Sequence, residues 1–373
     1  MQPTVLINHV VEPPGVITGI TRYTFGLTEA ILRRADIRIV FVTAWDGNDL
    51  PPIISTGVES VVTLPHISST PLNNLRQRRS IGHIARERDV DVVYAMNPTC
   101  PPVRGIPSII TVHDLYFEVL PQLYKRRHRL WWKLFFGDAA RRSTRVAFAS
   151  ANSARDATSI YPWLAEKARV VAGAGVLPHG NSDLPPEIGD SPYVLLLGNV
   201  TPNKNITFAI EAFRLLSSIG EPVRALHVGR DANGDLANAL NRGGTPEFFR
   251  SLGDVDDATL DALLRNAAAL VQPSHYEGFG LPIIEAQERG VPVIASDIGV
   301  FREVAGDGCI FVPLGDVRRL AEALQAITGD STMRARLSAA ALLNSRRFTW
   351  DRSGDAAVSM INEITLPRVK DPG

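Results

Sequence analysis

The chain has 373 residues, of which 45% are hydrophobic and 21% charged, the composition of an ordinary soluble globular protein. At roughly 150 residues per domain, this length predicts two domains. Lysine plus arginine number 39, and so do aspartate plus glutamate, which argues against a dedicated nucleic-acid-binding protein. No apolar run reaches the ~18 residues that a membrane-spanning helix needs.

The cysteine content and the N-terminal segment both bear on the cellular compartment in which the protein is expected. Cys100 and Cys309 are the only two cysteines, too few for a disulfide scaffold and without the spacing of metal ligands. Residues 1–14 have no cationic region before their apolar run, and prolines break that run. This segment predicts a strand rather than a signal peptide, so we expect a cytoplasmic protein.

Short β-branched runs alternate with helical patterns along the first half of the chain. Such alternation predicts parallel strands that are joined by helices. The expected elements are a strand over 4–10, a helix over 21–34, and strands over 37–42, 90–94 and 108–112.

A polar, proline-rich segment over 178–186 has the composition of an interdomain linker. After it the alternation restarts. The expected elements there are strands over 193–197 and 223–228, helices over 205–217 and 256–267, and an amphipathic helix over 356–364.

The sequence therefore predicts an α/β protein with two Rossmann-like, doubly wound domains that face each other across a cleft. We place the N-terminal domain at 1–178, with a C-terminal helix over 352–373 packing back on it. The second domain is placed at 179–351.

The most informative stretch, residues 275–285, reads His-Tyr-Glu-Gly-Phe-Gly-Leu-Pro-Ile-Ile-Glu. An apolar run typical of a buried strand precedes it, and its proline favours a helix that starts after the glycines. The amides of residues 278–281 would then point outward at the positive end of a helix dipole, which suits an anionic or polyhydroxyl ligand. Glu285 could accept hydrogen bonds from ligand hydroxyls, although an acidic residue in a first turn also stabilises the dipole without any ligand.

Other candidate residues follow strand ends, where ligands gather in sheets of this kind. Lys204 could neutralise a diphosphate as it becomes a leaving group, or it could be a solvated lysine beside the helix cap Asn205. The ring of His113 could hydrogen-bond a sugar hydroxyl, or it could be satisfied within the fold. Gly19 lies where flexible backbone can meet a phosphate, or where a turn needs glycine.

Asp254 and Asp256 have the spacing of a metal-binding pair. Asp256, however, stands where the following helix needs an N-cap. We therefore expect no metal site at this pair.

The segment from Tyr124 to Phe136 combines basic and aromatic residues on an expected helix. Its cationic, aromatic surface could rest on anionic lipid as a peripheral membrane contact. Alternatively, Trp131, Leu134 and Phe135 pack inside the domain and the arginines are solvated.

In their order, these motifs resemble glycosyltransferase family four. This family consists of retaining enzymes of the GT-B type with two Rossmann-like domains, and it includes bacterial mannosyl- and glucosyltransferases of surface-polysaccharide and lipopolysaccharide assembly. The two glutamates that enclose Gly-Phe-Gly-Leu-Pro are its most specific part. The resemblance covers nearly the whole chain and rests on segments 19–24, 113–114, 152–156, 202–205, 277–285 and 290–296.

The resemblance implies a role for each matching position. Glu285 would bind the ribose hydroxyls of the nucleotide, Glu277 would lie near the donor sugar, and Lys204 would bind the phosphates. His113 would contact the sugar, so that His113, Lys204 and Glu277 are the implied catalytic residues. The implied donor-binding residues are Gly19, Asn199, Asn203, Gly253, Val255, Gly278, Phe279, Gly280, Leu281 and Glu285.

The chain departs from the family next to the lysine. Members commonly carry an arginine just after the strand glycine or immediately before the lysine, and this chain has Asn199 and Asn203 at those positions. One of the cationic side chains expected to neutralise the diphosphate is therefore missing. Arg22 or Arg230 could replace it.

Together, the residues and the resemblance predict a retaining hexosyltransferase that needs neither a metal nor another cofactor. The expected donor is a nucleoside diphosphate sugar, GDP-mannose first and UDP-glucose as the alternative, and the expected acceptor is a glycan or a lipid-linked glycan. No carboxylate nucleophile is evident in the sequence. A non-catalytic sugar-nucleotide-binding protein of the same fold remains an alternative, and we expect no nucleic-acid partner.

Overall fold

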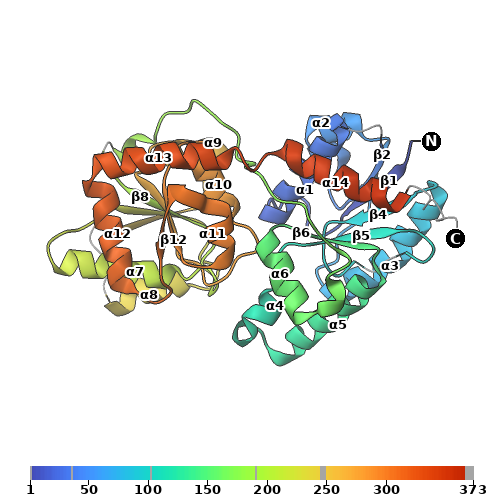
Figure 1. The fold of residues 1–373 in the computed structure, drawn as a ribbon, viewed down its shortest axis with the longest axis horizontal. Helices are drawn as coiled ribbons and strands as arrows, with labels where there is room; N and C mark the ends of the chain where they lie inside the picture. Colours follow the sequence, from blue (N-terminus) through green and yellow to red (C-terminus); the bar gives the residue numbers. More distant parts are fainter. Residues whose placement is uncertain (1, 35–36, 101–102, 190, 244–248, 366–373) are drawn as a thin grey trace, which may run out of the picture. The chain divides into compact units, whose positions relative to one another are not determined.

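The computed structural model describes residues 2–34, 37–100, 103–189, 191–243 and 249–365. The chain divides into two compact units (Figure 1). Unit 1 comprises residues 1–174 and 349–373, and unit 2 comprises residues 175–348. Unit 2 is thus inserted in the sequence between the body of unit 1 and its last helix.

A seven-stranded parallel sheet forms the centre of unit 1, with strand order β3-β2-β1-β4-β5-β6-β7. The internal strand β1 buries every one of its residues. Such uninterrupted burial is needed because helices cover both faces of a parallel sheet. The strands are β1 (Thr4–His9), β2 (Arg38–Thr43), β3 (Ser60–Thr63), β4 (Val92–Ala95), β5 (Ser108–Val112), β6 (Arg145–Phe148) and β7 (Ala168–Val170).

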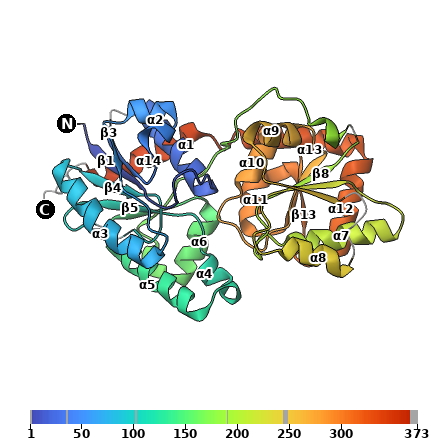
Figure 2. The same ribbon diagram turned by 180° about the vertical axis from the view of Figure 1, so that it is seen from behind.

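The helices of unit 1 lie on both faces of this sheet. α1 and α14 pack together on one face, and α3 and α5 lie beside each other on the other (Figures 1 and 2). An ion pair joins α3 to α5, with Nη2 of Arg78 2.9 Å from Oδ2 of Asp138. The helices are α1 (Gly19–Arg34), η1 (Gly47–Asp49), α2 (Pro52–Gly57), α3 (Thr70–Glu87), α4 (Tyr116–Val119), η2 (Pro121–Leu123), α5 (Arg126–Arg142), α6 (Ala151–Ile160), η3 (Pro162–Leu164) and α14 (Trp350–Thr365).

The last helix, α14, packs against α1 through small residues. A Cβ on Gly26 of α1 would lie 2.4 Å from Cε2 of Trp350, and one on Gly354 of α14 would lie 3.0 Å from Cβ of Ala30. The ring of Trp350 also meets that of Tyr23 edge-on, with centroids 5.7 Å apart. Close approach of the two helices therefore depends on glycine. Unit 1 contains all five tryptophans of the chain, which are Trp45, Trp131, Trp132, Trp163 and Trp350.

Unit 2 is built in the same way around a six-stranded parallel sheet, with order β10-β9-β8-β11-β12-β13. β8 and β11 are neighbours at its centre, so the loops that follow these two strands leave the same edge of the sheet side by side. The strands are β8 (Val194–Leu197), β9 (Ala225–Val228), β10 (Phe249–Gly253), β11 (Ala269–Gln272), β12 (Val293–Ser296) and β13 (Cys309–Val312).

The core of unit 2 is apolar side chains of its strands and of helices α7 and α12. Within the part of the chain that the structure describes, every helix is too short or too polar to span a bilayer. The helices of unit 2 are η4 (Pro186–Ile188), α7 (Ile206–Ser218), α8 (Asp235–Gly243), α9 (Asp257–Arg265), α10 (Leu281–Glu288), α11 (Gly299–Ala305), η5 (Gly306–Gly308), α12 (Val317–Gly329) and α13 (Ser331–Ser345).

The predicted α/β class with two doubly wound parallel sheets is confirmed. β5 has the predicted bounds, and β8, β9, α7 and α9 lie within three residues of theirs. The helix predicted over 352–373 begins at Trp350 and is described as far as Thr365. Residues 366–373 lie outside the described part of the chain.

Candidate functional site

Three glycines follow or end neighbouring strands of the unit 2 sheet, and we call them the glycine rim. The neighbouring strands β8, β9 and β10 lead to Gly198, Gly229 and Gly253, whose φ angles are +125°, +145° and +69°. A Cβ on Gly229 would lie 2.2 Å from the carbonyl oxygen of Gly198, and the Gly229 amide donates to the Gly253 carbonyl at 2.9 Å. The positive φ favours glycine at all three positions, and the lack of side chains there lets a ligand approach the backbone closely.

A buried histidine fixes the first glycine of this rim. His227 of β9 is fully buried, its Nε2 lies 3.0 Å from the Gly198 carbonyl, and its Nδ1 lies 3.0 Å from the Ser251 hydroxyl. A carbonyl only accepts hydrogen bonds, so Nε2 carries the proton. Burial lowers the pKa of His227, which keeps the ring neutral and suited to this arrangement.

The loops that follow β8 and β11 are joined at two points by hydrogen bonds. The backbone amide of His275 donates to the Asn203 carbonyl at 2.8 Å. Nδ2 of Asn205 donates to the Pro273 carbonyl at 3.2 Å. Asn205 stands at the N-cap position of α7 with a left-handed φ of 53°, and its side chain makes no capping bond. Asn205 is therefore the predicted N-cap residue of α7, but its side-chain amide binds the neighbouring loop instead of capping the helix.

These two loops bring Lys204 and Glu277 into direct contact. Nζ of Lys204 lies 2.7 Å from Oε1 of Glu277, and the same oxygen accepts from the hydroxyl of Ser274 at 2.8 Å. The Lys204 stem passes over Gly198, where a Cβ would lie 3.3 Å from Cε. Glu277 is only 8% exposed, so the cation is held at a defined place beside the glycine rim. Two predicted catalytic residues thus form one group.

Asn199 has a structural task in this rim. Its Oδ1 accepts from the backbone amide of Arg230 at 3.0 Å, which fixes the loop that follows β9. The guanidinium of Arg230 forms an ion pair with Asp254, directly after Gly253. Val255 follows in the same loop, so the predicted donor-binding residues Gly253 and Val255 lie at the end of β10, beside β9.

The stretch after β11 ends in a helix, as predicted. α10 begins at Leu281, and its N-cap Gly280 has a φ of +115° and makes no side-chain capping bond. A Cβ on Gly280 would lie 3.2 Å from the ring of Phe301, so both conformation and space require glycine there. Phe279, 6% exposed, packs edge-on against Phe348 with centroids 5.5 Å apart. Gly278 lies between Glu277 and this anchored residue, so the loop is held on both sides of it.

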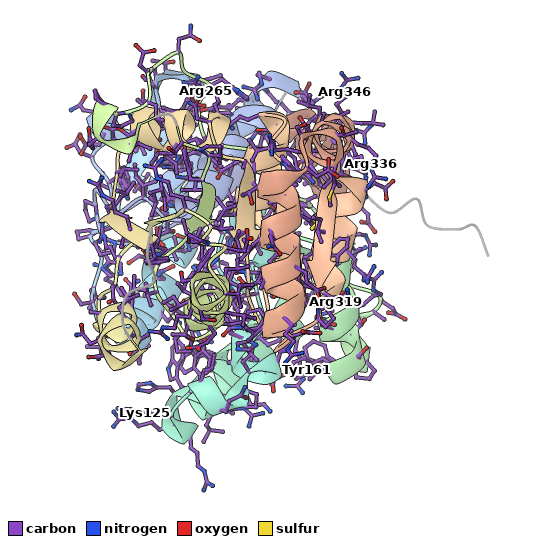
Figure 3. All side chains as sticks on the ribbon, turned by 90° about the vertical axis from the view of Figure 1, so that its left-hand side faces the viewer. Lys125, Tyr161, Arg265, Arg319, Arg336 and Arg346 are labelled. Carbon is purple, nitrogen blue, oxygen red and sulfur yellow. The ribbon has the colours of Figure 1, made fainter. Side chains whose placement is uncertain are left out.

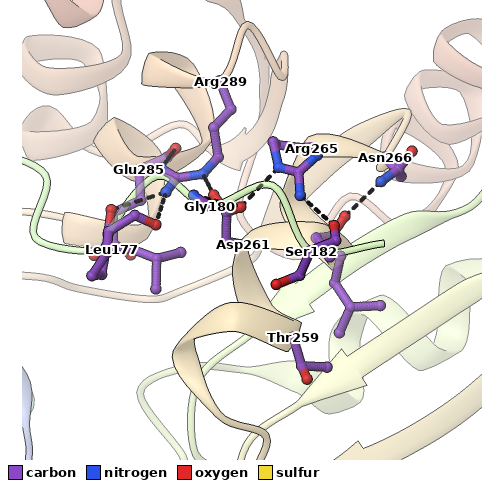
Figure 4. Close-up of polar contacts among 12 residues, drawn as sticks. Leu177, Gly180, Ser182, Thr259, Asp261, Arg265, Asn266, Glu285 and Arg289 are labelled. Carbon is purple, nitrogen blue, oxygen red and sulfur yellow. Dashed lines mark hydrogen bonds and ion pairs between the residues drawn. The ribbon is translucent and has the colours of Figure 1, made fainter. Parts of the chain in front are cut away.

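Glu285 lies in the middle of α10 and is 7% exposed. Burial, together with the charge of Glu285, raises the pKa of Glu288, one turn further along the helix. The Glu285 carbonyl accepts from Nη1 of Arg289 at 2.8 Å (Figure 4). This end of α10 is thus tied to a buried polar network.

Asp261 and Arg289 are the centre of that network, and both side chains are fully buried. Nε of Arg289 lies 2.7 Å from Oδ1 of Asp261, and its Nη2 donates to the carbonyls of Leu177 and Pro178 at 2.9 and 3.0 Å. Oδ2 of Asp261 accepts from the Gly180 amide at 3.1 Å (Figure 4). The ion pair therefore fastens the segment 177–180 to α9 and α10.

The remaining predicted residues, His113 and Gly19, belong to unit 1. His113 follows β5, and its Nε2 donates to the Met96 carbonyl at 3.1 Å while its ring meets that of Tyr23 edge-on at 5.0 Å. Burial lowers the pKa of His113 to about 4, so the ring is neutral at physiological pH. Gly19 is the first residue of α1, and the positive φ of this loop falls on Gly15 instead.

The predicted N-cap role of Asp256 is confirmed. Asp256 caps α9 by accepting from the Thr259 amide at 2.7 Å, and Asp254 pairs with Arg230. Among the described residues, no group of three His, Cys, Asp or Glu side chains gathers where it could hold a metal ion.

Sequence reasoning missed Ser274, His227 and the pair formed by Asp261 and Arg289. Ser274 precedes Glu277 by three residues, and that spacing across a turn could have indicated a partner. The other residues make contacts with distant segments, which no local pattern reveals.

Comparison with known proteins agrees with this geometry. A family model described as Glycosyltransferase Family 4 matches residues 17–173, and one described as glycosyl transferases group 1 matches residues 184–343. Between them they match the body of both units. The chain belongs to glycosyltransferase family four. This confirms the resemblance on which the sequence interpretation drew.

Two curated relatives are mannosyltransferases. The chain is 36% identical over 169 residues to a phosphatidyl-myo-inositol mannosyltransferase of Mycobacterium leprae, a match covering 44% of each protein. It is 37% identical over 164 residues to O-antigen chain mannosyltransferase B of Escherichia coli, covering 43% of this chain and 42% of the relative. The chain thus spans less than half the length of these relatives, and D-inositol 3-phosphate glycosyltransferases also match it.

Solved structures show that the fold is GT-B. WaaG, a glycosyltransferase involved in lipopolysaccharide biosynthesis, has a TM-score of 0.75 at 18% identity, covering 97% of this chain and all of that one. HepE of Anabaena, solved in complex with UDP and glucose, has a TM-score of 0.74 at 18% identity with the same coverage.

Proposed function

We propose that this family member transfers a hexose from a nucleoside diphosphate sugar to an acceptor hydroxyl with retention of the anomeric configuration. The contact of Lys204 with Glu277, beside the glycine rim and before the N-terminus of α10, carries the proposal. A cation and a helix N-terminus at one place suit the diphosphate that leaves in such a reaction.

In the proposed reaction, the bond between the anomeric carbon and the diphosphate oxygen breaks, and the acceptor oxygen bonds to that carbon on the same face. The acceptor proton passes to the departing phosphate oxygen. Lys204 and the first amides of α10 stabilise the negative charge that develops there, so the proposed reaction uses no metal and no other cofactor. Glu277 holds the lysine in place, and Glu285 binds the ribose.

The roles of His113 and Gly19 in unit 1 follow from the family resemblance. His113 is proposed to contact the donor sugar. Its ring is neutral above a pKa of about 4, so it would act as a hydrogen-bonding group rather than as a cation. Gly19 is proposed to offer backbone at the first turn of α1.

GDP-mannose is our first proposed donor and UDP-glucose the second. The similarity to two mannosyltransferases supports the first, and the UDP-glucose bound in a solved HepE complex supports the second. The proposed acceptor is a glycan or a lipid-linked glycan, and the proposed location is the cytoplasm.

A non-catalytic sugar-nucleotide-binding protein is the second candidate function. Its support is the pair of asparagines, Asn199 and Asn203, at positions where the family commonly carries an arginine. Oδ1 of Asn199 is engaged by the Arg230 amide, and Asn203 gives its carbonyl to His275. Transfer or hydrolysis of a donor by the purified protein would exclude this candidate.

Two substitutions test the site. Lys204→Ala should lower kcat by roughly 10²- to 10³-fold, as loss of one charge-stabilising group does, with little change in KM for the donor. Glu285→Ala should mainly weaken nucleotide binding, because the buried carboxylate is proposed to hold the ribose. Glu322→Gln, on the exposed face of α12, is the control and should change neither constant.

The measurement is initial-rate kinetics with GDP-mannose and with UDP-glucose, and NMR of the product gives the anomeric configuration. Undiminished turnover in both site variants on an accepted donor would overturn the assignment. An inverted product would overturn the proposed mechanism and leave the site intact. Full activity in EDTA would support a reaction without a divalent metal.

A further inference from the structure

Two neighbouring helices of unit 1 concentrate positive charge in a chain whose formal net charge is zero. Residues 70–87, which form α3, and 125–142, which form α5 and its N-cap, together contain eleven lysines or arginines and only two acidic residues. The acidic residues are Glu87 and Asp138, and Asp138 is shared between Arg78 and Arg142. Glu118, outside these ranges, also pairs with Arg129 and Lys133. Three carboxylates thus oppose eleven cations, and an excess of positive charge remains on the two helices.

The first half of α3 has its polarity reversed with respect to an ordinary surface helix. Asn73, Asn74 and Gln77 face inward and are at most 5% exposed, whereas Leu72 and Leu75 are 56% and 52% exposed. The inward amides bind the loops that follow β1 and β4, for example Gln77 Nε2 to the Val10 carbonyl at 2.9 Å. A helix normally buries its apolar face and exposes its polar one.

α5 also exposes two leucines. Leu130 and Leu134, one turn apart, are 59% and 61% exposed. The expectation that Leu134 packs inside was wrong, whereas Phe136 is fully buried and the rings of Trp131 and Phe135 stack on each other at 4.5 Å. Aromatic residues thus support the helix from within, and the leucines point outward.

The four leucines lie on the same stretch of the two helices. Both helices connect strands of one parallel sheet, so α3 and α5 run in the same direction. The ion pair of Arg78 with Asp138 fixes their register. All four leucines precede it by no more than about two helical turns, roughly 12 Å at 1.5 Å per residue.

Exposed cations accompany these leucines on both helices. Lys125, Arg126 and Arg127 begin α5 and are exposed, and Figure 3 shows Lys125 pointing away from the protein. Arg79 is exposed on α3. The combination of exposed leucines and exposed cations on the same two helices matches the interface of a bilayer with anionic headgroups.

We propose that α3 and the first half of α5 form a docking surface for an anionic lipid bilayer, defined by Leu72, Leu75, Leu130 and Leu134. Binding of a nucleic acid or of an acidic protein would require the cations alone. Neither partner would account for the four exposed leucines. This proposal does not depend on the transfer reaction, and it extends the predicted contact over 124–136 to α3.

Vesicle sedimentation tests the surface. Wild-type protein should bind vesicles of phosphatidylglycerol and phosphatidylcholine far better than vesicles of phosphatidylcholine alone, and 0.5 M NaCl should weaken this binding. Leu130→Gln with Leu134→Gln should lower the partition coefficient about tenfold, because each leucine contributes apolar burial. Gln keeps helix propensity, so the helix should stay folded.

Control variants make the result specific. Leu342→Gln with Leu343→Gln changes two exposed leucines of α13 in unit 2 and should bind vesicles like the wild type. Arg126→Gln with Arg127→Gln should lose binding, whereas Arg336→Gln with Arg346→Gln should not. Lys204→Ala should bind fully, which separates docking from catalysis.

Two outcomes would overturn the proposal. One is equal binding of the Leu130/Leu134 variant and its unit 2 control to anionic vesicles. The other is absence of wild-type binding to anionic vesicles at low salt, together with binding of polyanionic RNA that the same leucine variant leaves unchanged.

Discussion

At the scale of single residues, Lys204 and Asp261 show two uses of a buried or half-buried charge. Lys204 keeps part of its side chain accessible, so an arriving diphosphate can share it with Glu277. Asp261 is fully enclosed by Arg289, Arg265 and the Gly180 amide, so its charge serves the fold. The two arginines and one amide lower the pKa of Asp261 despite the cost of burial.

Removal of the Asp261 charge should strongly destabilise unit 2. In Asp261→Asn, Arg289 would remain buried without its partner, and breaking such a pair costs about 3–5 kcal/mol. Asp297→Asn breaks the pair with Arg302, which is largely exposed, and should cost less than about 1 kcal/mol. Urea denaturation followed by circular dichroism measures both. Similar midpoints for the two variants would show that the buried pair contributes little.

The same residues show what sequence reasoning can reach. Lys204 and Glu277 were predicted from motifs at the ends of two strands, because parallel strands deliver their loops to one edge. Asp261 and Arg289 could not be predicted, because they lie 28 residues apart and bind a segment whose path no periodicity describes. His227 appeared only as a polar residue within a strand.

At the scale of elements, most internal strands were predicted, whereas the internal strands β6 and β12 and all four edge strands were not. β5 is wholly buried and mostly apolar, which gives a clear pattern. β3, β7 and β10 lie at sheet edges and keep exposed or polar residues, so their patterns are weak. α3 misleads in another way, because its buried positions are amides and its exposed ones leucines.

The contact between α1 and α14 offers a test at this scale. Gly26→Ala would place a Cβ within 2.4 Å of the Trp350 ring, so the ring or the helix must move. Such overpacking typically costs about 1–3 kcal/mol. Gly329→Ala, at the end of α12 with nothing near the added Cβ, is the control and should be neutral or slightly stabilising. Thermal melts compare them, and Trp350→Leu should partly rescue Gly26→Ala if the clash is with the ring.

At the scale of the whole molecule, the predicted functional residues are distributed over the two units. The glycine rim, Lys204, Glu277 and Glu285 all belong to unit 2, whereas His113, Gly19 and the cationic leucine surface belong to unit 1. A net charge of zero hides this asymmetry, since the excess of positive charge on α3 and α5 is balanced elsewhere in the chain. Composition alone could therefore exclude a general nucleic-acid binder and still miss a local cationic surface.

The placement of every tryptophan in unit 1 gives the chain an internal optical label. Intrinsic tryptophan fluorescence follows the melting of unit 1, whereas far-ultraviolet circular dichroism follows both units. A nucleotide that binds unit 2 at a hundred times its dissociation constant should stabilise it by ~2.7 kcal/mol. GDP or UDP should thus raise the melting midpoint seen by dichroism and leave the fluorescence midpoint nearly unchanged. A shift of the fluorescence midpoint would instead place the nucleotide in unit 1, so tryptophan emission reports which unit has bound it.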